Sequence, residues 1–174
     1  MTKNYRSGLD DEKKCLKTDK SMDNRLSVKL FRVSPEKNSD IPLPRYMTPG
    51  SSGMDLYAAP GDKILLARGE ISLIPTGFAI ALPNGYEAQI RPRSGLSVKH
   101  GIGIINSPGT IDADFRGEIK IALINLGQNE HVVKRGDRIA QMVIQRVCRA
   151  RLEEITGQLD KTERGEGGFG HTGL

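Results

Sequence analysis

One stretch decides the fold of this 174-residue chain: His100-Gly-Ile-Gly-Ile-Ile-Asn-Ser-Pro-Gly-Thr-Ile-Asp-Ala-Asp-Phe-Arg-Gly117. A short apolar run reaches the turn signal Ser107-Pro108-Gly109, and the chain returns through Thr110-Ile111 before a second polar turn. The pattern predicts two short strands joined into a hairpin, with a tight corner after it. That corner, residues 112–117, holds two acids, an aromatic ring, an arginine and a glycine, which is more chemistry than a turn requires.

Short apolar segments separated by proline and glycine turns extend on both sides of this stretch. Further strands are predicted at residues 26–33, 53–59, 63–66, 70–74, 77–82, 86–91, 118–125, 131–133, 138–147 and near 149–155. Four prolines predict a surface loop at 34–50, and Ser94 can cap one short helix that ends at Gly101. The pattern therefore predicts an all-β fold, a jelly-roll-like distorted β-barrel with one short helix.

The two ends of the chain differ from this pattern. Residues 1–25 are polar, charged and without periodicity, which predicts a disordered N-terminal extension. Residues 26–156 form the predicted β domain. After Thr156 the chain is polar and glycine-rich, and no apolar core segment returns. Residues 157–174 are therefore predicted to be a flexible C-terminal arm.

Composition limits the functional classes. Hydrophobic residues make up 37 % of the chain, but aromatic residues only 5 %, so the core must be aliphatic. The net charge of +5 is spread along the sequence, which suits a small anionic ligand as well as a nucleic acid. The two cysteines allow no disulfide framework, and no apolar run reaches the roughly 18 residues of a membrane helix. Without a recognisable targeting segment, a cytoplasmic location is expected, with no membrane association.

Three features indicate a phosphate ligand, although each also has an ordinary structural explanation. Arg93-Ser94-Gly95 lies at a predicted helix N-terminus, where free N–H groups bind anions or are simply capped. The arm, residues 157–174, offers N–H donors, Arg164 and the stacking ring of Phe169, or is a disordered tail. Asp112 can act as a general base or as a turn residue. The residues alone predict a β domain that binds a phosphorylated ligand.

Five segments, taken together, resemble a known family. They are Gly53-Met-Asp-Leu-Tyr-Ala-Ala59, Pro92-Arg-Ser-Gly-Leu96, Gly109-Thr-Ile-Asp-Ala-Asp-Phe-Arg-Gly117, Gly136-Asp-Arg-Ile-Ala-Gln141 and Arg164-Gly-Glu-Gly-Gly-Phe-Gly170. In order and spacing they are similar to the five motifs of the trimeric dUTP diphosphatase (dUTPase) family, over residues 26–174. The resemblance implies a homotrimer with three sites shared between subunits. It also implies Mg²⁺-assisted hydrolysis of dUTP to dUMP and pyrophosphate, which keeps uracil out of DNA and supplies dUMP for dTMP synthesis.

The resemblance also implies roles for residues of the nucleoside end of the site. Asp112 is expected to orient and deprotonate the water that attacks the α-phosphorus. Asn106, with the backbone at Thr110 and Ile111, is expected to pair with uracil and to exclude a 5-methyl group. Phe115 is expected to pack under the deoxyribose. Tyr is more common at that position, and Phe keeps the ring.

At the phosphate end, the resemblance implies contacts from another subunit. The expected phosphate ligands are Arg93, Ser94, Gly95 and Gln141, with Asp55 and Asp137 bracing them. Mg²⁺ is expected on the triphosphate, through phosphate oxygens and waters and without direct protein ligands. The arm is expected to close over the nucleotide, with Phe169 on uracil, Arg164 on the γ-phosphate and Gly170 beside them. His171 occupies a position where Ser is usual.

Three alternative functions are weighed against this one. A dCTP deaminase of the same fold has a catalytic Glu where this chain has Ala122, and an alanine cannot transfer protons. A nucleotide-sensing module without catalysis is less consistent with Asp112 and a complete arm. A nucleic-acid binder is disfavoured by scattered charge and few aromatic residues, so no direct nucleic-acid binding is expected.

Overall fold

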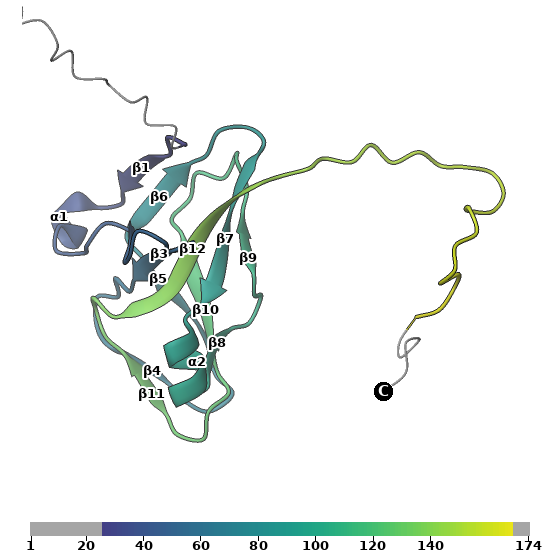
Figure 1. Ribbon diagram of the computed structural model, residues 1–174. Helices are drawn as coiled ribbons and strands as arrows, with labels where there is room; N and C mark the ends of the chain where they lie inside the picture. The colour runs from purple at the N-terminus through teal and green to yellow at the C-terminus, as the bar shows by residue number, and fades with distance from the viewer. Residues whose placement is uncertain (1–25, 169–174) are drawn as a thin grey trace, which may run out of the picture.

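A computed structural model describes residues 26–168, and a barrel of short β-strands forms its body (Figure 1). The elements of this part of the chain are, in order, β1 Lys29–Arg32, α1 Pro35–Asn38, β2 Arg45–Tyr46, β3 Met54–Tyr57, β4 Ile64–Leu66, β5 Ile71–Pro75, β6 Phe78–Ala81, β7 Tyr86–Pro92, α2 Ser94–His100, β8 Ile102–Ile104, β9 Gly109–Ile111, β10 Lys120–Asn125, β11 His131–Val133 and β12 Arg138–Arg146. The predicted disordered extension at residues 1–25 lies outside the described residues.

Antiparallel pairing joins these strands into four sheets. The largest has the order β2-β3-β12-β7-β9, and a second has the order β5-β10-β8. Two smaller sheets pair β1 with β6 and β11 with β4. The predicted all-β fold is therefore confirmed.

The pairing of β8 and β9 corrects the predicted hairpin. β8 pairs with β10 in one sheet, and β9 pairs with β7 in the other, so the two strands do not pair with each other. Ile105 still donates its N–H to the carbonyl oxygen of Ala122 on β10, at 3.0 Å, before the chain crosses. β8 and β9 have three residues each, so each makes a better hydrogen-bond ladder with a longer strand, β10 or β7, than with the other. The stretch therefore links two sheets, and its turn lies between them.

Three local predictions differ from the structure. A second helix, α1, forms within the predicted loop, because a proline is well tolerated in the first turn of a helix. Ser94 is the first residue of α2 instead of its cap. Arg93 occupies the N-cap position, and its carbonyl oxygen accepts the N–H groups of Leu96 and Ser97, both at 3.0 Å. The strand expected near 149–155 does not form. After Val147 the chain leaves the barrel (Figure 1), where no strand edge of the described chain accompanies it.

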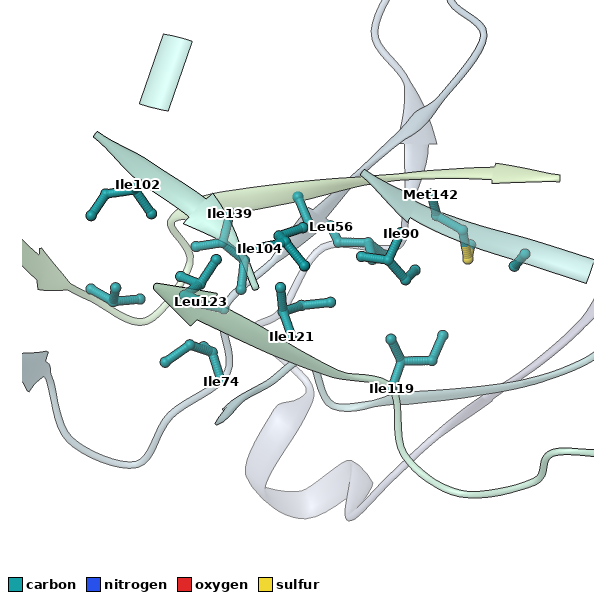
Figure 2. Close-up of a cluster of buried hydrophobic side chains, with 14 of the residues drawn as sticks. Leu56, Ile74, Ile90, Ile102, Ile104, Ile119, Ile121, Leu123, Ile139 and Met142 are labelled. Atoms are coloured by element: carbon teal, nitrogen blue, oxygen red, sulfur yellow. The ribbon is translucent and has the colours of Figure 1, made fainter. Parts of the chain in front are cut away.

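An aliphatic core fills the space between the two larger sheets, as the composition predicts. Figure 2 shows Ile121 and Leu123 of β10 directed toward Leu56 of β3, Ile90 of β7 and Met142 of β12. All five side chains are buried. Because side chains alternate along a strand, the neighbours of these core residues point to the outer faces of the sheets, where the candidate site lies.

Gly127 meets the end of α2 so closely that no side chain fits between them. A Cβ atom at this position would overlap the carbonyl oxygen of His100. Leu126 also donates its N–H to the carbonyl oxygen of Gly101, which caps α2 with a φ of 69°. This contact holds the helix whose first turn contributes Ser94 and Gly95 to the candidate site.

We expect Gly127→Ala to lower the free energy of unfolding by at least about 2 kcal/mol, since backbone atoms cannot move aside as a side chain can. Gly61→Ala is the matched control, because a Cβ atom there meets nothing within 4 Å. The control should lie within about 0.5 kcal/mol of wild type in urea unfolding at equal protein concentration. Equal stabilities of the two variants would contradict the close contact.

Candidate active site

A buried carboxylate organises the first part of the site. Asp55 on β3 is only 2 % exposed. Its Oδ2 lies 3.1 Å from Nη1 of Arg138 and 3.6 Å from Nη2 of Arg93. Its Oδ1 accepts a hydrogen bond from Nε2 of Gln141 at 3.2 Å. The cluster of Asp55, Arg93, Arg138 and Gln141, which we call the Asp55 cluster, therefore carries a net positive charge.

The alternation of β3 and β12 explains why these polar groups meet. Leu56 and Met142 face the core, so their neighbours Asp55 and Gln141 face outward, directly opposite each other across the two strands. Gly53 leaves the room that this requires, since a Cβ atom there would lie 3.2 Å from Cβ of Gln141.

Arg93 is held by a second contact as well as by Asp55. Its Nη1 donates to the carbonyl oxygen of Arg138 at 2.9 Å. It stands directly before α2, so Ser94 and Gly95, the next two residues, are placed at the start of the helix. The N–H groups of a first helical turn have no carbonyl partner within the helix. Fixed guanidinium groups, a side-chain amide and free N–H groups form an anion-binding arrangement.

An open cavity of about 630 Å³ lies beside the Asp55 cluster. Arg45, Arg93 and Arg138 line it together with His131 and Asp137. Asp137 was expected to brace the phosphate ligands. Its Oδ2 accepts the N–H of Lys134 at 2.7 Å, so its carboxylate holds the turn before β12.

The second part of the site is the corner after β9. Asp112 is exposed, and its carbonyl oxygen accepts the N–H of Phe115 at 3.2 Å, which closes the turn. Arg116 fixes the corner by donating to the carbonyl oxygens of Ala113 and Phe115, both at 2.7 Å. Among residues 26–168, the Asp112 carboxylate makes no hydrogen bond or salt bridge. It is therefore available to a ligand or a water.

The neighbouring side chains form an amide-and-ring surface. The Asn106 amide lies beside Gly109, where a Cβ atom would be 3.3 Å from its Nδ2. Phe115 is 40 % exposed, and its ring lies over Gly117. Thr110 is exposed and Ile111 is half-buried. An amide, an aromatic face and a free carboxylate thus lie within one short stretch of chain.

The strand register separates the two parts of the site. Ile111 pairs with Ala88 on β7, whereas Gln141 pairs with Arg91 on the same strand, and Asp112 lies one residue beyond Ile111. At about 3.3 Å per residue and 4.8 Å between strands, the Cα atoms of Asp112 and Gln141 are roughly 16 Å apart. One chain therefore does not bring its Asp55 cluster next to its own Asp112.

The arm lies away from both parts in this single chain (Figure 1). Nε of Arg164 donates to the carbonyl oxygen of Gly167, at 2.8 Å, within the arm itself. Phe169, Gly170 and His171 lie outside the described residues.

Sequence reasoning missed Arg138 as a site residue, although it makes a shorter contact with Asp55 than Arg93 does. The only indication in the sequence that Arg138 belongs to the site was its position between Asp137 and Gln141 in the fourth motif. Its spacing does not reveal the contact, because the register between β12 and β3 shifts between Arg138 and Ala140, and Arg138 is paired with Tyr57 instead of Asp55.

Comparison with known proteins identifies the family. The dUTPase family model matches residues 39–173. The chain belongs to the dUTPase family. A dUTPase relative, the deoxyuridine 5'-triphosphate nucleotidohydrolase of Thermoanaerobacter sp., is 56 % identical over 86 % of this chain and its own full length. That of Caldanaerobacter subterraneus is 52 % identical over the same shares.

Solved dUTPase structures share the fold. The dUTPase of Staphylococcus bacteriophage 80alpha with dUPNHPP matches 85 % of this chain and 99 % of its own, with 25 % identity and a TM-score of 0.76. A mutant dUTPase of the S. aureus phage phi11, described with a structural Mg(II) ion, covers 75 % of this chain and 97 % of its own, at 21 % identity and a TM-score of 0.67. No described helix of the chain is long and apolar enough to cross a membrane.

His131 lines the cavity beside the Asp55 cluster and is a titratable group with a shifted pKa. Burial lowers the pKa of His131, and the nearby His100, whose ring centroid is 5.0 Å away, lowers it further, while Asp137 opposes the shift. An unfolded histidine has a pKa of about 6.5, so the unfolded chain binds this proton more tightly.

We therefore expect the free energy of unfolding to fall as the pH is lowered through about 6.5. His131→Gln should remove this part of the pH dependence, because no proton is then taken up on unfolding at that position. His100→Gln should only reduce it, since burial of His131 remains. Urea unfolding between about pH 5 and 7.5 measures all three proteins, and an unchanged slope in His131→Gln would exclude His131 as its source.

Proposed function

We propose that this chain hydrolyses dUTP to dUMP and pyrophosphate. Family membership and relatives that are more than 50 % identical and carry this activity in their names support the proposal. In this chain, the proposal is supported mainly by two groups of side chains on the same sheet, one suited to phosphates and the other to a nucleoside and a water. One is a positively charged cluster locked by Asp55, and the other is a free carboxylate beside an amide and an aromatic ring.

Asp112 is the proposed catalytic residue. Its carboxylate orients a water and accepts a proton as the water oxygen attacks the α-phosphorus. The bond from that phosphorus to the bridging oxygen breaks, and pyrophosphate leaves. Arg93, Gln141 and the N–H groups of Ser94 and Gly95 hold the phosphate oxygens, where negative charge develops.

The nucleoside is recognised along residues 106–115, which include the turn before β9, the strand itself and the corner after it. The Asn106 amide, with the backbone at Thr110 and Ile111, pairs with uracil, because an amide offers both a donor and an acceptor. The exposed ring of Phe115 packs against the deoxyribose and leaves no room for a 2′-OH. Phe in place of Tyr keeps this packing surface.

The arm completes the site by closing over the nucleotide. In this proposal residues 157–174 form the closing segment, with Phe169 and Gly170 at the base and Arg164 at the γ-phosphate. Arg164 has only a carbonyl partner within the described part of the arm, so an ionic phosphate contact is a favourable exchange. Closure excludes water and aligns the phosphates.

Mg²⁺ bound to the substrate would neutralise charge on the triphosphate. Within the described residues, no three His, Cys, Asp or Glu side chains gather as a metal site. An ion carried by phosphate oxygens and waters is a usual mode for Mg²⁺ at nucleotide sites, and the proposal assigns it no direct protein ligand.

A homotrimer with shared sites is proposed for two reasons. The roughly 16 Å between the Asp55 cluster and Asp112 favours a site completed by a second copy. The outer face of the β5-β10-β8 sheet is also apolar, with Ile71, Leu73 and Ile105 exposed around Ile124. Ile105 adjoins Asn106, so a copy that covers this face also borders the nucleoside pocket.

In the cell, this activity keeps uracil out of DNA and supplies dUMP for dTMP synthesis. A cytoplasmic location is proposed with it, because Cys148 is a free, exposed thiol in the described part of the chain.

We expect Asp112→Asn to abolish release of pyrophosphate from dUTP while dUTP still binds, because the positive groups that hold the phosphates remain. Asp114→Asn is the matched control, since it makes the same change two residues away in the same exposed corner. Incubating each protein with each deoxynucleoside triphosphate and Mg²⁺, followed by product identification, tests activity and substrate together. Equal loss in both variants, unchanged dUTP with wild type, or ammonia from dCTP would contradict the proposal.

Mixed oligomers test whether two chains share a site. Asp112→Asn and Arg93→Gln chains should each be inactive alone. Refolded together, they should form mixed trimers in which about one site in four combines an intact Asp112 with an intact Arg93 from the other chain, with activity in proportion. Each variant refolded alone is the control. A mixture no more active than its parents would place both groups of a site in one chain.

A further inference from the structure

Arg45 stands at one end of a row of polar side chains that crosses four strands. Arg45 of β2 pairs with Asp55 of β3, Asp55 pairs with Gln141 of β12, and Gln141 pairs with Arg91 of β7. Paired residues of antiparallel strands project from the same face, about 5 Å apart. Because Asp55 and Gln141 face outward, Arg45 lies on the outer face directly beside the buried carboxylate.

Arg45 also shares the cavity beside the Asp55 cluster with Arg93 and Arg138. Three guanidinium-bearing residues from three separate elements therefore border one open space of about 630 Å³. The carboxylates nearest to this space are both engaged. Asp55 accepts contacts from Arg93, Arg138 and Gln141, and Asp137 accepts the N–H of Lys134.

The Arg45 guanidinium differs from the others in having no acceptor within the described chain. Arg138 and Arg93 contact Asp55, and Arg91 at the other end of the row donates to Oε1 of Gln89 at 2.7 and 3.3 Å. Arg45 makes no side-chain hydrogen bond or salt bridge to any residue between 26 and 168. A positive group beside engaged carboxylates, facing an open cavity, is complementary to an anion with several charges.

We propose that Arg45 is a further phosphate-binding residue, which extends the Asp55 cluster and contacts the pyrophosphate part of the bound nucleotide. This inference about Arg45 depends on the proposed function in one respect, namely that the bound nucleotide is a triphosphate. Arg45 lies outside the five motifs, and its position on β2 brings it to the cluster. The planar guanidinium fork matches two phosphate oxygens, which a lysine cannot contact in the same way.

The contact is expected in substrate and product alike, because pyrophosphate carries the same oxygens before and after cleavage. Such uniform binding affects KM and leaves kcat nearly unchanged. A charge-assisted hydrogen bond to phosphate corresponds to roughly a tenfold change in affinity.

The test is titration calorimetry of inorganic pyrophosphate into the full-length protein, with KM and kcat for dUTP measured alongside. Arg45→Gln should weaken pyrophosphate binding and raise KM about tenfold each, with kcat within about twofold of wild type. Arg45→Lys should recover part of the affinity. Arg68→Gln, which removes the same charge from an exposed turn between β4 and β5, is the matched control and should bind as wild type does.

Equal pyrophosphate affinities for Arg45→Gln and Arg68→Gln, or no measurable binding by wild type, would overturn the proposal. Thermal unfolding of each variant shows whether the exposed strand β2 is intact, and a loss of binding that follows a loss of folding would also count against a direct contact. Failure of the proposed function appears differently, since wild type would then leave dUTP unchanged while its pyrophosphate affinity still depended on Arg45.

Discussion

The burial of the Asp55 carboxylate is the constraint on which the rest of the site depends. An ionised carboxylate taken out of water is strongly unfavourable unless cations and donors surround it. Here they are supplied by Arg93 at the N-cap of α2, Arg138 at the start of β12 and Gln141 within β12. Asp55 in turn orders these long side chains, because without its carboxylate they would sample many rotamers. A buried acid thus holds positively charged groups in a fixed arrangement, and they would need little reorganisation to bind the proposed phosphate ligand.

Residues 102–111 cross from one sheet to the other, and this crossing positions Asn106 and Asp112. Ile102 and Ile104 secure one end in the core against β10, and β9 secures the other end against β7. The turn between them presents Asn106 at the edge of the barrel, and the corner after β9 presents Asp112. A barrel with a dense aliphatic core is rigid enough to hold both, but the sheet register keeps Asp112 away from the Asp55 cluster of the same chain. This separation is the reason why the proposed active site needs a second copy of the chain.

Sequence reasoning succeeded where a signal was local. Alternating apolar residues located most strands, including β3, β7 and β12, and the low proportion of aromatic residues predicted the aliphatic core of Figure 2. It failed where pairing decided the outcome. The strand expected near 149–155 has suitable residues but no partner edge in the described chain, and β8 and β9 each found longer partners than one another. Asp112 could be named from its motif, and Asn106 from the resemblance just before that motif. The contact of Arg138 with Asp55, and the position of Arg45 beside Asp55, could not be named, because both depend on how strands distant in sequence pair.

The sequence by itself determined the strand-rich fold, the apolar interior and, through five ordered motifs, the family. These properties follow from the periodicity and the order of residues, and both can be read directly from the sequence. Only the tertiary structure decided which charged groups share a carboxylate, which arginine of the described chain faces the cavity without an acceptor, and how far Asp112 lies from the Asp55 cluster. Those properties depend on the register between strands distant in sequence, and a shift of one residue would turn every side chain of a strand to the opposite face.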